Sequence, residues 1–143
     1  MISRIVLAVA VVAVGISAVV ADVISDRQAL MKRSGGQAKI GAAMAAGREP
    51  FDLAKAKAVF ENYVDKAGKL PTLFADKPKA DDKTSAAAAI WEKPAEFKAQ
   101  GEKFGREAKA ALEATKDLDS FKAQFAIVQK NCAGCHETFR IKS

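Results

Sequence analysis

The chain has 143 residues, of which 50% are hydrophobic and 28% are charged, and its formal net charge is +6. This length suits one ordinary domain and is too short for a nucleotide-binding domain joined to a substrate domain. Alanine and lysine are abundant and β-branched residues are sparse after residue 23, so the composition favours helices over sheets. It also excludes collagen-like chains and secreted proteins that depend on many disulfides.

The N-terminus has the three parts of an export signal. Met1–Arg4 supplies a positive charge, Ile5–Val20 contains no charged residue, and Ala21 with Val19 offers small residues to signal peptidase. We therefore expect residues 1–21 to be cleaved, which leaves residues 22–143 in the periplasm without a membrane anchor. The alternative is an uncleaved anchor, because Ile5–Ala21 lies at the lower edge of the length that spans a bilayer.

Four helical segments are predicted from apolar residues at helical spacing and from the capping residues, glycines and prolines that bound them. They are Val23–Ala46 ended by Gly47, Asp52–Leu70 ended by Pro71, Pro94–Ala114, and a last helix that starts after Asp117 or Asp119 and runs almost to the C-terminus. A long polar connector, Thr72–Ser85, follows the second segment and continues into a short turn at Ala86–Trp91. Four amphipathic helices with one long connector predict an all-α, antiparallel four-helix bundle.

The last helix contains an unbroken alternation of three- and four-residue steps between apolar side chains. The residues in this pattern are Leu118, Phe121, Phe125, Val128, Cys132, Cys135 and Phe139. Residues at this spacing share one face of a helix, so we expect both cysteines to lie on the face that packs inward.

Both cysteines and the only histidine fall within Cys132-Ala133-Gly134-Cys135-His136, the C-x-x-C-H pattern that attaches a c-type haem. Thiols three residues apart on a helix point the same way, so both can reach the vinyl groups of one porphyrin, and His136 can bind the iron as its proximal ligand. A thioredoxin-like pair would need a βαβ context, and a structural zinc site would need a fourth ligand. The motif therefore predicts one haem c per chain, attached through Cys132 and Cys135.

The chain resembles the class II c-type cytochromes, the family that includes cytochrome c′. The resemblance rests on Cys-Ala-Gly-Cys-His-Glu-Thr-Phe-Arg near the C-terminus, on the four-helix pattern, and on Arg-Gln-Ala-Leu-Met in the first helix. It covers the chain from about Val23 to its end and implies one bundle domain over residues 22–143. Members of this family hold one haem among their helices and often form homodimers.

Met31 is the candidate for the second axial ligand of the iron. A second histidine is not available, and Met44 lies about 220° around an ideal helix from Met31, so the two cannot point the same way. In the family, an apolar residue at the corresponding position crowds a vacant iron site, whereas low-spin members have a methionine there that binds the iron. The resemblance also assigns Arg27 to a haem propionate and Arg140 to a propionate or the proximal imidazole. Arg140 equally suits a helix C-terminus.

The two ligation states predict different functions. An iron bound by His136 and Met31 is low-spin, closed to other ligands, and needs little reorganisation when it gains or loses an electron, so it suits a one-electron carrier. The thioether also raises the reduction potential. An open site would instead bind nitric oxide or carbon monoxide. We do not expect an enzyme, since no distal histidine is available for acid–base chemistry. We expect redox proteins as partners and do not expect nucleic acid. The sequence does not decide between a monomer and a homodimer.

Overall fold

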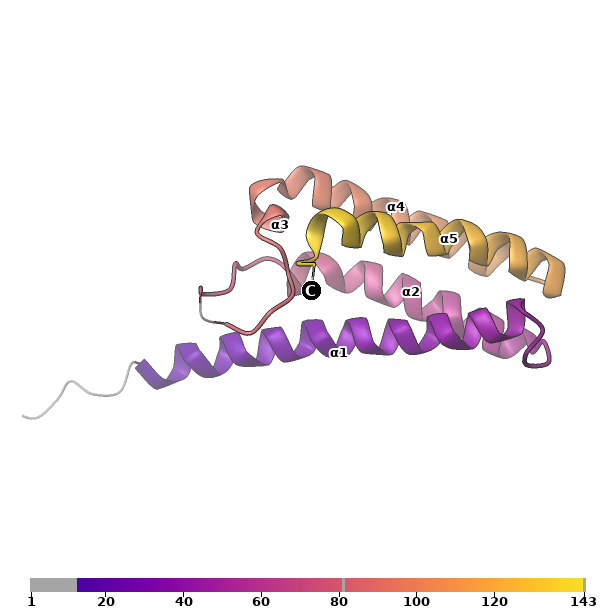
Figure 1. The fold of residues 1–143 in the computed structure, drawn as a ribbon, viewed down its shortest axis with the longest axis horizontal. Helices are drawn as coiled ribbons and strands as arrows, with labels where there is room; N and C mark the ends of the chain where they lie inside the picture. The colour runs from indigo at the N-terminus through magenta and orange to yellow at the C-terminus, as the bar shows by residue number, and fades with distance from the viewer. Residues whose placement is uncertain (1–12, 81, 143) are drawn as a thin grey trace, which may run out of the picture.

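The computed structural model describes residues 13–80 and 82–142 and consists of helices joined by short loops and one long connector (Figure 1). The helices are α1 (Ala13–Ala45), α2 (Leu53–Leu73), α3 (Ala89–Glu92), α4 (Pro94–Ala114) and α5 (Leu118–Phe139). Within the described ranges there is no strand, and residues Ala86 and Arg140 form an isolated antiparallel bridge. None of the described helices is both long enough and apolar enough to cross a bilayer.

The four long helices run alternately along the same axis and form an antiparallel bundle (Figure 1). Contacts join α1 to α2, α2 to α4, α4 to α5 and α5 back to α1, so the helices follow this order around the core. The short loops between α1 and α2 and between α4 and α5 lie at one end, while the connector and α3 lie at the other. The predicted all-α four-helix bundle is confirmed.

Local signals in the sequence fix most of the helix ends. Asp52 caps α2 by accepting a hydrogen bond from the backbone N–H of Lys55 at 2.9 Å. Asp117 and Ser120 cap α5 reciprocally, each side chain accepting from the other residue's backbone N–H. Gly47 takes a φ of 69° just after α1, a left-handed conformation that a residue without a Cβ adopts at little cost.

Two predicted boundaries differ in the structure. The first helix begins at Ala13 rather than Val23 and crosses the expected cleavage point after Ala21. Residues 1–12 lie outside the described part of the chain, so the signal peptide stays a prediction. The second helix does not stop at Pro71 but continues to Leu73. Pro71 cannot donate a hydrogen bond of its own, but the backbone N–H of the next buried residue, Phe74, bonds to the carbonyl of Leu70 at 3.0 Å and completes the last turn of α2.

We call the half of the bundle nearest the two short loops the closed half. Its buried side chains form one cluster: Met44, Ala56, Val59, Phe60, Tyr63, Phe104, Ala108, Ala111, Phe121, Phe125 and Val128. Helix α1 approaches α5 closely here, since a Cβ added to Gly41 would lie 2.4 Å from Cε2 of Phe125. The closed half is a continuous apolar core of the kind that sets the crossing of helices in a bundle.

We call the half nearest the connector the open half. Its buried apolar cluster is smaller and consists of Leu30, Leu70, Phe74, Ile90 and Phe139. Met31, Phe97, Trp91 and Cys135 pack against this cluster while remaining partly exposed. The open half therefore contains the cysteine motif and the methionine that the sequence singled out.

Candidate functional site

Two hollows meet at the end of α5 that carries the cysteine motif. The first, which we call the inner slot, lies inside the bundle between α1, α2, α4 and α5. Its lining residues are Met31, Lys66, Leu70, Phe97, Gln100, Gly101, Phe104, Asn131, Cys132, Cys135 and His136. The second, the outer hollow, has a volume of about 440 Å³ and lies between α1, the connector and the end of α5. Met31 and His136 line both, so the two hollows are parts of one site.

Cys132 and Cys135 occupy the same face of α5 and both line the inner slot, as the helical spacing predicts. Both are half-buried, and their thiols are free rather than joined in a disulfide. Burial raises the pKa of the Cys135 thiol above its usual value, which keeps it in the neutral form. The two thiols are therefore available for covalent attachment of a group held in the slot.

His136 follows directly on α5 and is also half-buried. Its pKa is lowered, first by burial and then by the positive charges of Lys66 and Arg140. Each of these effects disfavours the imidazolium form. The side chain is thus held as a neutral imidazole, the form that binds metals.

Met31 reaches both hollows from α1, whereas His136 reaches them from α5. Three neighbours of Met31 on the same helix are all buried, namely Arg27, Leu30 and Ser34. Met44 is only 1% exposed and belongs to the closed-half cluster, away from the site. The structure therefore brings Met31 to the cysteine motif and leaves Met44 out.

Arg27 is 5% exposed and lines the outer hollow. Its guanidinium donates to the carbonyl of Leu73 and to that of Asp76, the second at 2.7 Å, and it lies over the rings of Phe74 and Trp91 at 5.0 and 5.5 Å. One nitrogen, Nη1, is buried and has no hydrogen-bond acceptor in residues 13–80 and 82–142. A buried donor without an acceptor is costly, so this nitrogen suits a carboxylate bound in the hollow.

Arg140 stands at the C-cap of α5, where its backbone is extended with φ −120° and ψ 136°. Its exposed side chain lines the outer hollow with Arg27, so two cationic side chains border the same opening. Both readings of Arg140 from the sequence thus have a structural basis, because the residue ends the helix and also borders the site.

Lys66 was not predicted from the sequence. It lies on α2, is only 8% exposed, and holds its Nζ 5.1 Å from the centre of the Phe104 ring inside the inner slot. Burial lowers its pKa. The signal for it was its spacing, since Lys66 comes three residues after Tyr63 and four before Leu70, both of which are buried.

Asn131 is a second residue that sequence analysis missed. It lies on α5 beside Cys132, is 6% exposed, and lines the inner slot. Its amide donates to the carboxylate of Glu107 at 2.5 Å and to the carbonyl of Val128 at 3.1 Å. Its Oδ1 is buried and has no hydrogen-bond donor among the described residues.

This set of side chains fits a haem. Two thiols and an imidazole line the slot on α5, a thioether faces it from α1, aromatic rings of α4 form an apolar wall, and an arginine with a free donor stands at the opening. A haem offers matching features, namely two vinyl groups, an iron, two apolar faces and two carboxylates. In the described part of the chain no three histidine, cysteine or carboxylate side chains gather in a way that could hold a bare metal ion.

Comparisons with known proteins agree with this fit. A family model described as Cytochrome C′ matches residues 22–140. Cytochrome c-556 of Rhodopseudomonas palustris is 34% identical over 125 residues, covering 85% of this chain and 84% of that relative, and cytochrome c′ of the same organism is 38% identical over 121 residues, covering 85% and 83%. The solved structure of Rhodopseudomonas palustris cytochrome c′ superposes with a TM-score of 0.80 at 38% identity, covering 85% of this chain and 98% of that one.

Proposed function

The chain belongs to the cytochrome c′ family and binds one haem c covalently, and we propose that it carries single electrons with His136 and Met31 as the axial ligands. The haem supplies, when bound, an iron that can change between the ferric and ferrous states. We assign covalent attachment to Cys132 and Cys135, whose free thiols share one face of α5.

The observation that carries the proposal is the placement of Met31. Its side chain comes from α1 and lines the same two hollows as His136, which comes from α5. A thioether is a competent axial ligand for haem iron and raises the reduction potential. An iron held by two protein side chains has no free position for a gas, so this arrangement favours electron transfer.

Arg27 and Arg140 complete the proposed site at the outer hollow. We assign Nη1 of Arg27 to a haem propionate because this nitrogen is buried and has no acceptor among the described residues. Arg140 borders the same hollow but is exposed, so we expect its contribution to a propionate to be weaker.

A second function is favoured by a different observation. Relatives named cytochrome c′ match this chain as well as relatives named cytochrome c-556 do. The outer hollow also reaches both Met31 and His136. The alternative is therefore a five-coordinate cytochrome c′ that binds nitric oxide or carbon monoxide at an open position.

We further propose that residues 1–21 are an export signal and that the mature protein works in the periplasm. The match to the family begins at residue 22, directly after the expected cleavage point, which supports this division. Redox proteins are the proposed partners, and a homodimer is compatible with the proposal. Enzymatic activity is not proposed, because the chain has no second histidine to move protons at the iron.

The deciding experiment is electron paramagnetic resonance of the ferric holoprotein at neutral pH. We expect a low-spin signal that becomes high-spin in Met31→Ala. Met44→Leu is the matched control, because Met44 is buried in the closed half, and it should stay low-spin. A high-spin signal in the unmodified protein would contradict Met31 ligation and make gas binding the leading function.

A further inference from the structure

The connector is fastened to the C-terminal segment by backbone hydrogen bonds. The N–H of Ala87 donates to the carbonyl of Phe139 at 3.0 Å, and the N–H of Ile141 donates to that of Ser85 at 2.8 Å. These bonds surround the antiparallel bridge between Ala86 and Arg140. We call connector residues 83–87 the strap.

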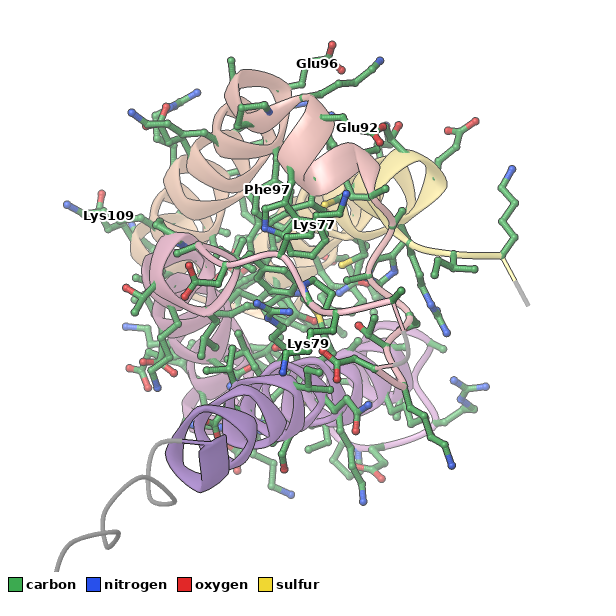
Figure 2. The ribbon with its side chains drawn as sticks, turned by 90° about the vertical axis from the view of Figure 1, so that its left-hand side faces the viewer. Lys77, Lys79, Glu92, Glu96, Phe97 and Lys109 are labelled. Atoms are coloured by element: carbon green, nitrogen blue, oxygen red, sulfur yellow. The ribbon has the colours of Figure 1, made fainter. Side chains whose placement is uncertain are left out.

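The strap is also fastened to α1. Nε2 of Gln28 donates to the carbonyl of Lys83 at 3.4 Å. The start of the connector is held from the same helix by Arg27, which donates to the carbonyls of Leu73 and Asp76. Figure 2 looks at this end of the bundle and shows the connector, with Lys77 and Lys79, passing across it above α1.

The two fastenings of the strap lie one helical turn from the two proposed axial ligands. Gln28 comes three residues before Met31 on α1, and Phe139 comes three residues after His136 on α5. Strap residues Thr84, Ser85 and Ala86 line the outer hollow together with these ligands. The strap is therefore a direct link across the site between the middle of α1, which carries Met31, and the end of α5, which carries His136.

The close approach between α1 and α5 is far from this link. It occurs at Gly41 and Phe125 in the closed half, which is about 15 Å along α1 from Met31 at 1.5 Å per residue. A contact at that distance fixes the crossing of the two helices but leaves the spacing at Met31 free to vary. The strap supplies the restraint at the ligand end.

We propose that the strap positions α1 against α5 so that Met31 stays on the iron and the sixth coordination position stays filled. This inference rests on the proposed ligation by His136 and Met31. Gln28 and the backbone N–H of Ile141 act as positioning groups, since they act through Met31. Loosening the strap leaves the haem attached through its thioethers but increases the fraction of time for which Met31 is off the iron.

The variant that tests this is Ile141→Pro, studied as the holoprotein. Proline removes the N–H that donates to Ser85, and Arg140 before it already has the extended backbone that precedes proline. Ile141→Ala is the matched control, because it shortens the same 51% exposed side chain but keeps the N–H. The measurement is the rate at which carbon monoxide binds the ferrous protein, followed by stopped-flow absorbance.

We expect carbon monoxide to bind Ile141→Pro about 2- to 10-fold faster than the unmodified protein, the range that the loss of one hydrogen bond allows. Ile141→Ala should bind at the unmodified rate. Equal rates in Ile141→Pro and Ile141→Ala would overturn the inference. If Ile141→Pro does not accumulate as holoprotein, Gln28→Ala tests the other fastening, where an unchanged rate overturns it equally.

General loss of stability is separated from positioning by Gly41→Ala. That substitution strains the approach to Phe125 in the closed half and leaves the strap intact, so it should lower the melting temperature without raising the carbon monoxide rate. An equal acceleration in Gly41→Ala would overturn the positioning role. A high-spin unmodified protein overturns Met31 ligation itself, whereas a low-spin protein with an unchanged Ile141→Pro rate overturns only the role of the strap.

Discussion

In the closed half, Phe60, Phe121 and Val128 are fully buried and pack within one cluster of apolar side chains. In the open half, Arg27 and Lys66 are buried beside apolar side chains, and two hollows separate the helices. The same four long helices form both halves. The chain alone therefore fills the core of the closed half. In the open half, its side chains line two hollows that they do not fill.

An unpaired donor supports this reading of the open half. Arg27 lines the outer hollow, and its buried Nη1 has no hydrogen-bond partner among the described residues. Buried polar groups in folded proteins are nearly always paired. A haem propionate would supply the acceptor that Nη1 of Arg27 lacks, and the porphyrin would supply apolar surface to the two hollows.

Removing both attachment cysteines should produce the largest difference in stability between the two halves. In Cys132→Ala with Cys135→Ala the haem is not attached, so the open half loses the group that fills it and the stabilisation that bound haem supplies. We expect amide hydrogen exchange to accelerate over residues 23–35 and 74–92 and to stay slow over residues 56–63 and 104–111. Equal acceleration in both halves would show that the closed half is not an independent core.

Phe121→Ala should produce the next largest effect, in the opposite half. Phe121 is fully buried, and its ring centre lies 6.0, 5.6 and 5.3 Å from those of Phe51, Phe60 and Phe125. Truncating a buried phenylalanine costs about 3–5 kcal/mol of unfolding free energy, which guanidinium denaturation of the holoprotein would measure. The haem absorption spectrum before unfolding should not change.

The control for Phe121→Ala is Ile127→Ala, a truncation on the same helix at a side chain that is 46% exposed. Its unfolding free energy should stay within about 0.5 kcal/mol of the unmodified protein. A shift of the haem spectrum in Phe121→Ala would show that the two halves are coupled more tightly than their separate clusters suggest.

The smallest expected effect concerns Asp117, which caps α5 at the closed end. Hydrogen bonds from the side chain and the backbone N–H of Ser120 lower the pKa of the Asp117 carboxyl below its usual 3.8. A lowered carboxyl pKa stabilises the fold above pH 3.8, and this contribution is lost as the pH falls through the folded-state pKa. Asp117→Asn keeps a capping oxygen but does not titrate.

Thermal melts of the unmodified protein and Asp117→Asn, between about pH 6 and about pH 2, measure this contribution. We expect the unmodified protein to be slightly more stable at the upper end and the difference to disappear at the lower end. A difference that is constant with pH would contradict a role for the Asp117 charge. The haem spectrum should be the same in both proteins, because the cap lies at the closed end.

Local chemistry explains which parts of the fold could be predicted from the sequence. The structure has α4 at Pro94–Ala114 and the α5 cap at Asp117, where proline and a capping side chain act within one turn of the chain. The prediction that the second helix ends at Pro71 was wrong, because a proline ends a helix only if the residues after it are free to leave the helical path. Here Phe74 is buried and the carbonyl of Leu73 accepts a hydrogen bond from Arg27.

The same distinction applies to the candidate site: features set within one helix could be predicted, and features set by contacts between helices could not. The cysteine motif could be predicted because its geometry depends only on helical spacing along α5. Helical spacing places Lys66 on the buried face of α2, but its position in the inner slot could not be predicted, because it depends on how α2 packs against α4 and α5. The hydrogen bonds that join the strap to Phe139 and Ile141 could not be predicted either, since they connect residues more than fifty positions apart in the sequence.

The place of the cysteine motif on α5 has a consequence for how the protein is made. A ribosome synthesises the chain from its N-terminus, so α1, α2 and α4 exist before Cys132 and Cys135 are added. Residues of α1, α2 and α4 therefore precede the attachment cysteines in the order of synthesis, and porphyrin can be joined to these thiols only after all three segments have been made.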